Sequence, residues 1–169
     1  RSFLEGEGIR LLGVVPQEQL LQSISVGDLV DTVEGEMLCC QEKRDELVEN
    51  LMVGAMSAAA ALHYFRLKPN KAVITGGDRP DVLLAALETS TRCLVLTGRL
   101  SPAPQVVERA AQGGVPIIIT RHDTLTAINL IQSSFGKTRF QQQKKMRRFQ
   151  EIMDESFDYA RLYRLLDVG

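Results

Sequence analysis

Short runs of β-branched and aliphatic residues alternate with stretches of helical periodicity through the middle of this chain. Residues 71–75, 93–97 and 115–120 are mostly apolar and rich in β-branched residues, which is typical of strands buried on both faces. The helical stretches that follow them cover about residues 81–89, 104–112 and 124–131. All three runs end in Thr, at intervals of 22 and 23 residues. This repeat predicts βαβ units with parallel strands, and hence an α/β fold with a mostly parallel sheet and helices on both faces.

The flanking segments carry weaker patterns of the same kind. A strand is predicted at residues 9–15, and further strands at 37–40 and 51–53. Ser25 and Ser57 are suitable N-caps for helices at 26–33 and 58–65. Apolar residues recur at helical spacing from Phe149 to Ala160, which adds C-terminal amphipathic helices to the predicted fold.

Composition and charge narrow the function classes. The chain has 169 residues, a net charge of −1, 44% hydrophobic residues and no Trp, so neither a strongly electrostatic nucleic-acid binder nor a base-stacking platform is favoured. The basic run at 144–148 is followed by acidic residues at helical spacing, which indicates a solvated, self-paired helix face or an interdomain lever. Three cysteines without a CxxC pair indicate a reduced, cytoplasmic protein. No apolar run reaches the length of a membrane helix, so no membrane partner is expected.

The best candidate site lies after the three Thr-ended strands. Ligands of open parallel sheets bind outside the carboxyl ends of the strands, where loops lead into helix N-termini that favour anions. Arg79, Arg99 and Arg121 add positive charge from the three loops. One contiguous ligand-binding cleft is therefore predicted from Thr75, Gly76, Gly77, Asp78, Arg79, Thr97, Gly98, Thr120, His122, Asp123 and Thr124. The alternative is that the aspartates only cap helices, the glycines only make turns and the arginines pair locally.

The chain offers little for catalysis. His122 stands next to Asp123, and adjacent residues do not form the relay that a catalytic triad requires. Gly136-Lys137-Thr138 resembles the end of a phosphate-binding loop but follows a predicted helix instead of a strand. Cys39 and Cys40 alone do not supply the ligands of a metal site. No catalytic residue, metal or cofactor is assigned, and a nucleotide or another anionic metabolite is the expected ligand.

The motifs at the predicted edge resemble those of the DRTGG domain. The resemblance runs from about Leu47 to Phe140 and rests on Thr75-Gly-Gly-Asp-Arg-Pro-Asp81, Leu96-Thr-Gly98, Gly114-Val-Pro116 and His122-Asp-Thr124. Asp78-Arg79 matches the start of the motif, whereas Pro80-Asp81-Val82 stands where Thr-Gly-Gly would be. This form is similar to the DRTGG domains of long bacterial phosphotransacetylases.

A second resemblance concerns the N-terminal part. Residues 9–16 with Leu20-Leu21 resemble the last strand of a dethiobiotin-synthetase-like P-loop domain, which precedes the DRTGG domain in such proteins. The organisation expected from both resemblances is a P-loop-domain remnant or linker at 1–45, a DRTGG-like α/β domain at 46–140 and a helical tail at 141–169.

The resemblance implies a function without catalysis. It suggests a regulatory and oligomerisation domain of a phosphotransacetylase-like or P-loop protein, which senses a nucleotide or anionic metabolite at the carboxyl edge of its sheet. The expected partners are a second copy, as a homodimer or higher oligomer, and other domains of the parent protein. Two alternatives remain open. The chain is part of a phosphate acetyltransferase or dethiobiotin-synthetase-type ATP-dependent enzyme whose catalytic domain lies outside it, or it is a purely structural assembly module.

Overall fold

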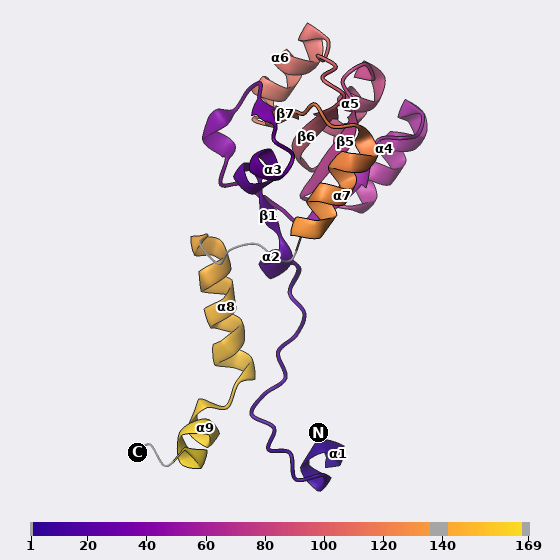
Figure 1. Ribbon diagram of the computed structural model, residues 1–169. Coiled ribbons are helices and arrows are strands. Elements are labelled where there is room, and N and C mark those ends of the chain that lie inside the picture. Colours follow the sequence, from indigo (N-terminus) through magenta and orange to yellow (C-terminus); the bar gives the residue numbers. More distant parts are fainter. Residues whose placement is uncertain (1, 136–141, 167–169) are drawn as a thin grey trace. The chain divides into compact units, whose positions relative to one another are not determined.

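The computed structural model describes residues 2–135 and 142–166 of the chain (Figure 1). These form two compact units, one of residues 22–139 and one of residues 1–21 with 140–169. The motif Gly136-Lys137-Thr138 and the predicted boundary between residues 140 and 141 lie outside the described residues.

A five-stranded sheet with the strand order β2-β7-β6-β5-β4 forms the centre of the larger unit. Its four parallel strands are β4 (Asn50–Val53), β5 (Lys71–Gly76), β6 (Thr91–Thr97) and β7 (Ile117–Ile119). The short strand β2 (Glu36–Met37) pairs antiparallel with β7. A separate antiparallel pair consists of β1 (Ile24–Ser25) and β3 (Leu47–Val48). The prediction of a mostly parallel sheet is confirmed.

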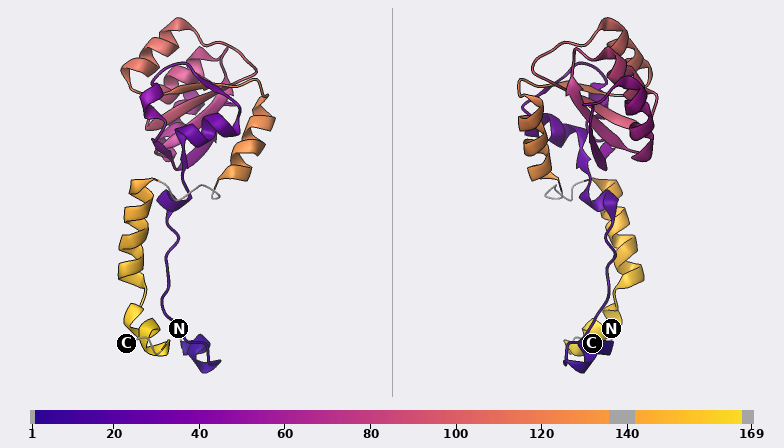
Figure 2. Two further views of the ribbon diagram at one scale, coloured as in Figure 1. Left: turned by 60° about the vertical axis from the view of Figure 1, so that its left-hand side comes forward. Right: turned by 90° about the vertical axis from the view of Figure 1, so that its right-hand side faces the viewer.

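Helices cover both faces of the sheet. Successive strand residues point to opposite sides, so a mostly apolar strand gives the sheet two apolar faces that must be buried. Ala72 and Ile74 of β5 belong to one buried cluster, together with α3 (Val26–Thr32) and α7 (Thr124–Ser134). Val73 belongs to a second cluster, on the face covered by α4 (Ala58–Leu67), α5 (Pro80–Leu87) and α6 (Pro104–Gln112). Figure 2 shows the sheet enclosed between these two layers of helices. The predicted α/β fold class is confirmed.

Local sequence explains where these helices begin. Pro80 and Pro104 occupy the first turns of α5 and α6, where the missing N–H would have no intrahelical partner. Ser25 caps α3, since its hydroxyl accepts a 3.0 Å hydrogen bond from the Asp28 backbone N–H. Ser57 also occupies an N-cap position, at α4, but its side chain makes no capping hydrogen bond.

Two predicted strands are shorter than their apolar runs. The run at 115–120 gives β7 only over Ile117–Ile119. The run at 37–40 was expected to be a strand throughout, whereas β2 ends at Met37. Cys40 adopts the left-handed conformation, with φ of 55°, and leads into the 3₁₀ turn η1 (Gln41–Lys43). The ladder cannot continue through that backbone conformation.

Residues before position 46 contribute to the same core as the sheet. Ile24, Leu29 and Val33 are fully buried in the cluster that contains Ile74 of β5. The position of the predicted domain boundary, between residues 45 and 46, thus lies inside the larger unit, between η1 and β3. Its use as a domain boundary stays a prediction.

The smaller unit contains α1 (Ser2–Gly6), α8 (Gln143–Ser156) and α9 (Tyr159–Leu165), while α2 (Gln19–Gln22) spans the division between the units. The predicted strand at 9–15 is wrong. A strand needs a ladder partner, and among the described residues this segment makes one antiparallel bridge, from Gly13 to Phe157. Phe157 is extended and separates α8 from α9, so the predicted C-terminal amphipathic helices are present as two segments.

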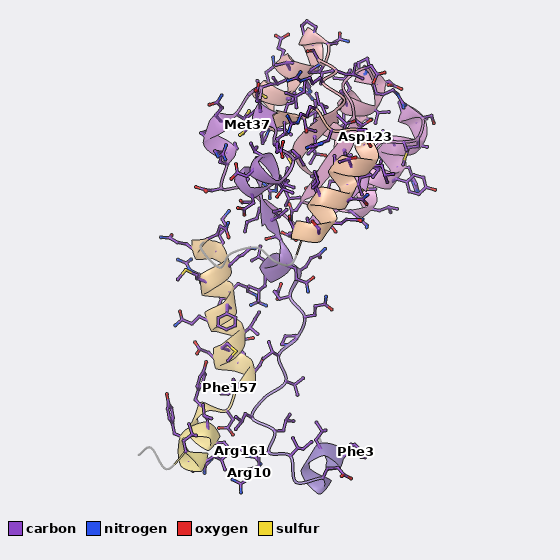
Figure 3. The ribbon with its side chains drawn as sticks, viewed as in Figure 1. Phe3, Arg10, Met37, Asp123, Phe157 and Arg161 are labelled. Atoms are coloured by element: carbon purple, nitrogen blue, oxygen red, sulfur yellow. The ribbon has the colours of Figure 1, made fainter. Side chains whose placement is uncertain are left out.

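Side-chain contacts hold this smaller unit together. Arg148 donates to Glu18 over 2.9 Å, and Arg161 donates to the Leu11 carbonyl over 3.0 Å. Figure 3 labels Arg161 and Phe157 at the junction of α8 and α9. Across the helices that the structure describes, none is long and apolar enough to cross a membrane.

Candidate functional site

The carboxyl ends of β5, β6 and β7 lie at the same edge of the sheet. Thr75 is in register with Leu96 of β6, and Leu96 with Ile119 of β7. Because the strands are parallel, the loops that follow them all leave from this edge. The structure therefore places the three Thr-ended loops together, as the sequence predicts.

A cleft of about 450 Å³ lies at this edge. Eight of the predicted site residues line it: Thr75, Gly76, Asp78, Arg79, Thr97, Gly98, Asp123 and Thr124. A volume of this size is within the range of small-molecule sites. The structure thus brings together most of the predicted set, and its role in binding stays a prediction.

Three predicted residues, Gly77, Thr120 and His122, do not line the cleft. Gly77 packs against the Leu100 carbonyl, so closely that a Cβ would overlap it. The buried Thr120 hydroxyl donates to the Val33 carbonyl over 2.6 Å. The His122 carbonyl accepts from the Gly98 N–H over 2.8 Å, while its buried Nε2 has no hydrogen-bond partner in the described part of the chain. These residues fix the loops behind the cleft.

Sequence reasoning missed part of the lining. Val53, Gly54 and Ala55 line the cleft from the end of β4, and Leu100 lines it from the loop after β6. A Cβ at Gly54 would meet the Val82 side chain at 2.8 Å, so the chain passes there only with glycine. A glycine at the end of a strand or directly after it also occurs at Gly76 and Gly98, and this signal could have found the β4 loop.

Hydroxyl groups at the base of the cleft form a connected network. The Thr75 hydroxyl donates to the Gly54 carbonyl over 3.1 Å, which ties β5 to the end of β4. The Thr97 and Thr124 hydroxyl oxygens are 2.8 Å apart and share a hydrogen bond. The Thr97 hydroxyl also donates to the Thr75 carbonyl over 3.4 Å, so these bonds together connect all four lining segments.

Two charged side chains of the cleft, Arg79 and Asp123, already form hydrogen bonds or ion pairs with neighbouring residues. Arg79 donates to the Met56 carbonyl over 2.9 Å and pairs with Asp81 at 3.4 Å. Asp123 caps α7, as Figure 3 shows at the start of that helix, and accepts from the Thr126 hydroxyl and N–H. These bonds hold the pKa of the Asp123 carboxyl below its usual value. Asp123 therefore caps a helix, as the alternative interpretation of the sequence expects for the aspartates.

The expected convergence of three arginines is not found. Arg79 lines the cleft, whereas Arg99 and Arg121 do not. Arg121 pairs with Glu34, a residue far away in the sequence. Arg99 is exposed and adopts a positive φ of 57° between Gly98 and Leu100, at the rim. Within residues 2–135 and 142–166, no three His, Cys, Asp or Glu side chains gather as metal ligands.

Comparison with known families identifies the fold that carries this cleft. The DRTGG domain family matches residues 28–134, more than half of the chain. The chain belongs to the DRTGG domain family. The matched residues include β5, β6 and β7 with the loops that follow them. The resemblance seen in the sequence is thus confirmed for the DRTGG part.

Curated proteins similar to this chain are much longer than it is. A phosphate acetyltransferase of Synechocystis is 26% identical over 145 residues, which is 79% of this chain and 21% of that protein. A cobalt-dependent inorganic pyrophosphatase of Clostridium perfringens is 26% identical over 110 residues, 65% of this chain and 20% of that protein. The chain therefore spans about a fifth of the length of these relatives.

A solved structure has a similar fold. It holds the CBS and DRTGG domains of the regulatory region of the Clostridium perfringens pyrophosphatase, in complex with its activator, diadenosine tetraphosphate. The TM-score is 0.59 at 20% sequence identity, and the match covers 79% of this chain and 67% of that one. This likeness supports the fold.

Proposed function

We propose that this chain is a regulatory, non-catalytic DRTGG domain of a phosphate acetyltransferase-like protein, and that it binds a nucleotide in the cleft at the carboxyl edge of its sheet. The observation that carries the proposal is the cleft itself, which is lined by the ends of β4, β5 and β6 and by the start of α7, and whose Thr75, Thr97 and Thr124 hydroxyls are hydrogen-bonded to these segments. Membership of the family supports it, because a relative's regulatory region is solved with a dinucleotide activator.

Binding is tested with a panel of small molecules on the full chain. Thermal shift and titration calorimetry are run with ATP, GTP, diadenosine tetraphosphate, acetyl-CoA and acetyl phosphate. A nucleotide is expected to raise the melting temperature, since a ligand that binds only the folded state stabilises it. Absence of binding by every compound in the panel would contradict the proposal.

Matched threonine variants assign the site. Thr97→Val removes a hydroxyl from the base of the cleft, and we expect it to weaken nucleotide binding at least tenfold. The control is Thr91→Val in the same strand, whose buried hydroxyl bonds the Ala86 carbonyl over 2.7 Å at the opposite edge. Each variant loses the two hydrogen bonds of one buried hydroxyl, so equal losses of affinity would indicate a general effect on folding.

We also propose self-association, which the edges of the open sheet make favourable because an exposed strand presents unpaired backbone groups. β4 is one of these edges, and its residues are half-buried. Light scattering at micromolar concentration is expected to give at least twice the 18.8 kDa of one chain. A purely structural assembly module would associate in this way and bind none of the compounds in the panel.

An enzymatic role for the chain alone is the rival proposal. It predicts formation of acetyl phosphate from acetyl-CoA and inorganic phosphate by the purified chain. We expect no turnover, because His122 is held behind the cleft and no nucleophile–base pair lines it among the described residues.

The N-terminal resemblance leads to a further part of the proposal. We propose that residues 9–16, which form no strand in this structure, correspond in sequence to the last strand of a P-loop domain of the dethiobiotin synthetase type. Ile9, Val14 and Val15 of this segment are 52%, 72% and 48% exposed, and exposed apolar side chains of this kind support a segment that packs against another part of a protein. A coding sequence upstream of residue 1 without a phosphate-binding loop would contradict this.

A further inference from the structure

The cleft is lined by more acidic than basic side chains. Asp78 and Asp123 line it with one arginine, Arg79. That arginine is already engaged with Asp81 and the Met56 carbonyl. A phosphate group deep in this cleft would therefore face two carboxylates and a guanidinium whose charge is shared with a third. A ligand group that donates hydrogen bonds fits the interior better than an anion does.

Asp78 is the acceptor that is available. Its side chain folds back over Gly76, so that a Cβ at Gly76 would overlap the Asp78 carboxylate. In the described part of the chain Asp78 makes no hydrogen bond and no ion pair. The oxygens of Asp123, in contrast, both accept from Thr126. A carboxylate with two open oxygens can accept from two neighbouring hydroxyls at once.

We propose that the cleft recognises the ribose of the nucleotide, with the 2′- and 3′-hydroxyls donating to the two oxygens of Asp78. Val53 and Leu100 line the same cleft and provide an apolar surface for the base. The phosphates then point outward to the rim, where Arg79 and the exposed Arg99 are placed. An acidic side chain on a ribose diol is an established solution in other nucleotide-binding folds. This inference rests on the proposed nucleotide binding.

Paired ribo- and deoxyribonucleotides test the inference. Calorimetry on the full chain compares ATP, GTP, CTP and UTP with their 2′-deoxy and 3′-deoxy counterparts. For the ribonucleotide that binds best, loss of either hydroxyl is expected to weaken binding at least tenfold, because a hydrogen bond to a charged group is lost. Asp78→Ala is expected to lower ribonucleotide affinity and to bring the ribo-to-deoxy ratio near one. Asp45→Ala, an exposed carboxylate outside the cleft, is the control and should leave the ratio unchanged.

The outcomes separate this inference from the proposed function. Equal affinity for ribo- and deoxynucleotides would overturn the ribose inference and leave nucleotide binding intact. If the Asp78→Ala variant keeps the same ratio of ribonucleotide to deoxyribonucleotide affinity as the wild type, Asp78 does not recognise the ribose. If the chain binds acetyl phosphate or inorganic phosphate but no nucleotide, both the ribose inference and the proposed nucleotide binding are wrong. Absence of all binding would overturn the inference together with the proposed function.

Discussion

Gly77 is the residue at which the loop after β5 meets the loop after β6. A Cβ at this position would overlap the Leu100 carbonyl, and a backbone atom cannot move aside as a flexible side chain can. We expect Gly77→Ala to lower the free energy of unfolding by about 3 kcal/mol, which is typical of overpacking against fixed neighbours. Urea denaturation measures the loss.

Gly76→Ala is the matched control for that change. Its added methyl group would meet the tip of the Asp78 side chain, which is exposed and free to rotate away. We expect this variant to lose less than about 1 kcal/mol. Similar losses in the two variants would show that the close approach at Gly77 is not what makes glycine necessary there.

Lys71 is a buried cation at the opposite edge of the sheet. The residue is fully buried at the start of β5, and its Nζ donates to the Thr89 hydroxyl over 2.8 Å and to the Ser90 carbonyl over 3.1 Å. Burial lowers the pKa of the Lys71 ammonium from 10.5 to about 8. Between these two values the unfolded chain binds more protons than the folded one. The free energy of unfolding therefore rises with pH across this interval, by up to about 3 kcal/mol.

The variant Lys71→Met isolates this effect. Other groups titrate in the same interval, and their contributions cancel when the wild type and the variant are compared at each pH. We expect the wild type to gain stability relative to the variant as the pH rises from about 8 to about 10.5. Urea denaturation at several pH values provides the comparison, and parallel curves would mean that Lys71 keeps its ordinary pKa in the folded protein.

At the scale of single elements, two serines at helix starts give a direct comparison. Ser25 accepts from the Asp28 N–H over 3.0 Å and donates to the Asp28 carboxylate over 2.7 Å. Ser57 holds the same position at α4 without a capping hydrogen bond. We expect Ser25→Ala to lower the free energy of unfolding by about 1–2 kcal/mol. Ser57→Ala is expected to lower it by only about a few tenths of a kcal/mol. Thermal unfolding that ranks the two variants in the reverse order would contradict the role of the Ser25 cap.

Elements with local signals were predictable from the sequence, and those that depend on distant partners were not. Helix α6 has the predicted bounds, 104–112, because Pro104 and Gly113 mark its ends. The strand expected at 9–15 failed because an apolar run is a strand only where another strand pairs with it. The end of β2 at Met37 and the left-handed backbone at Cys40 are not signalled by any residue type in that run.

The candidate site follows the same rule. The sequence placed Thr75 and Thr97 at one edge because strand direction in βαβ units is fixed by the connection between them. It could not place Arg121, whose partner Glu34 is 87 residues away in the sequence. The charge of the cleft is set by such pairings, and this is why the expected cluster of three arginines became a cleft with more carboxylates than free cations.

At the scale of the whole molecule, the core predicts where the chain can be divided. Residues 22–45 supply Ile24, Val26, Leu29 and Val33, all with 0% of their surface exposed. Burying each such side chain contributes about 1.5–3 kcal/mol, so their sum is comparable to the whole stability of a typical domain. A fragment of residues 22–139 is therefore expected to unfold cooperatively, with a melting temperature close to that of the same unit in the full chain.

A fragment of residues 46–139 is the decisive comparison, because it begins at the boundary predicted from the sequence. It keeps β4, β5, β6 and β7 but lacks α3, β1 and β2, so one face of its sheet loses the helix that covers Ile74 and Ile118. Exposed apolar surface of that kind leads to association or to a molten state. We expect this fragment to show no cooperative transition in circular dichroism and no thermal shift with nucleotide, whereas residues 22–139 show both. Cooperative unfolding of residues 46–139 with an unchanged midpoint would instead establish residue 46 as the start of the domain and make α3 an accessory to it.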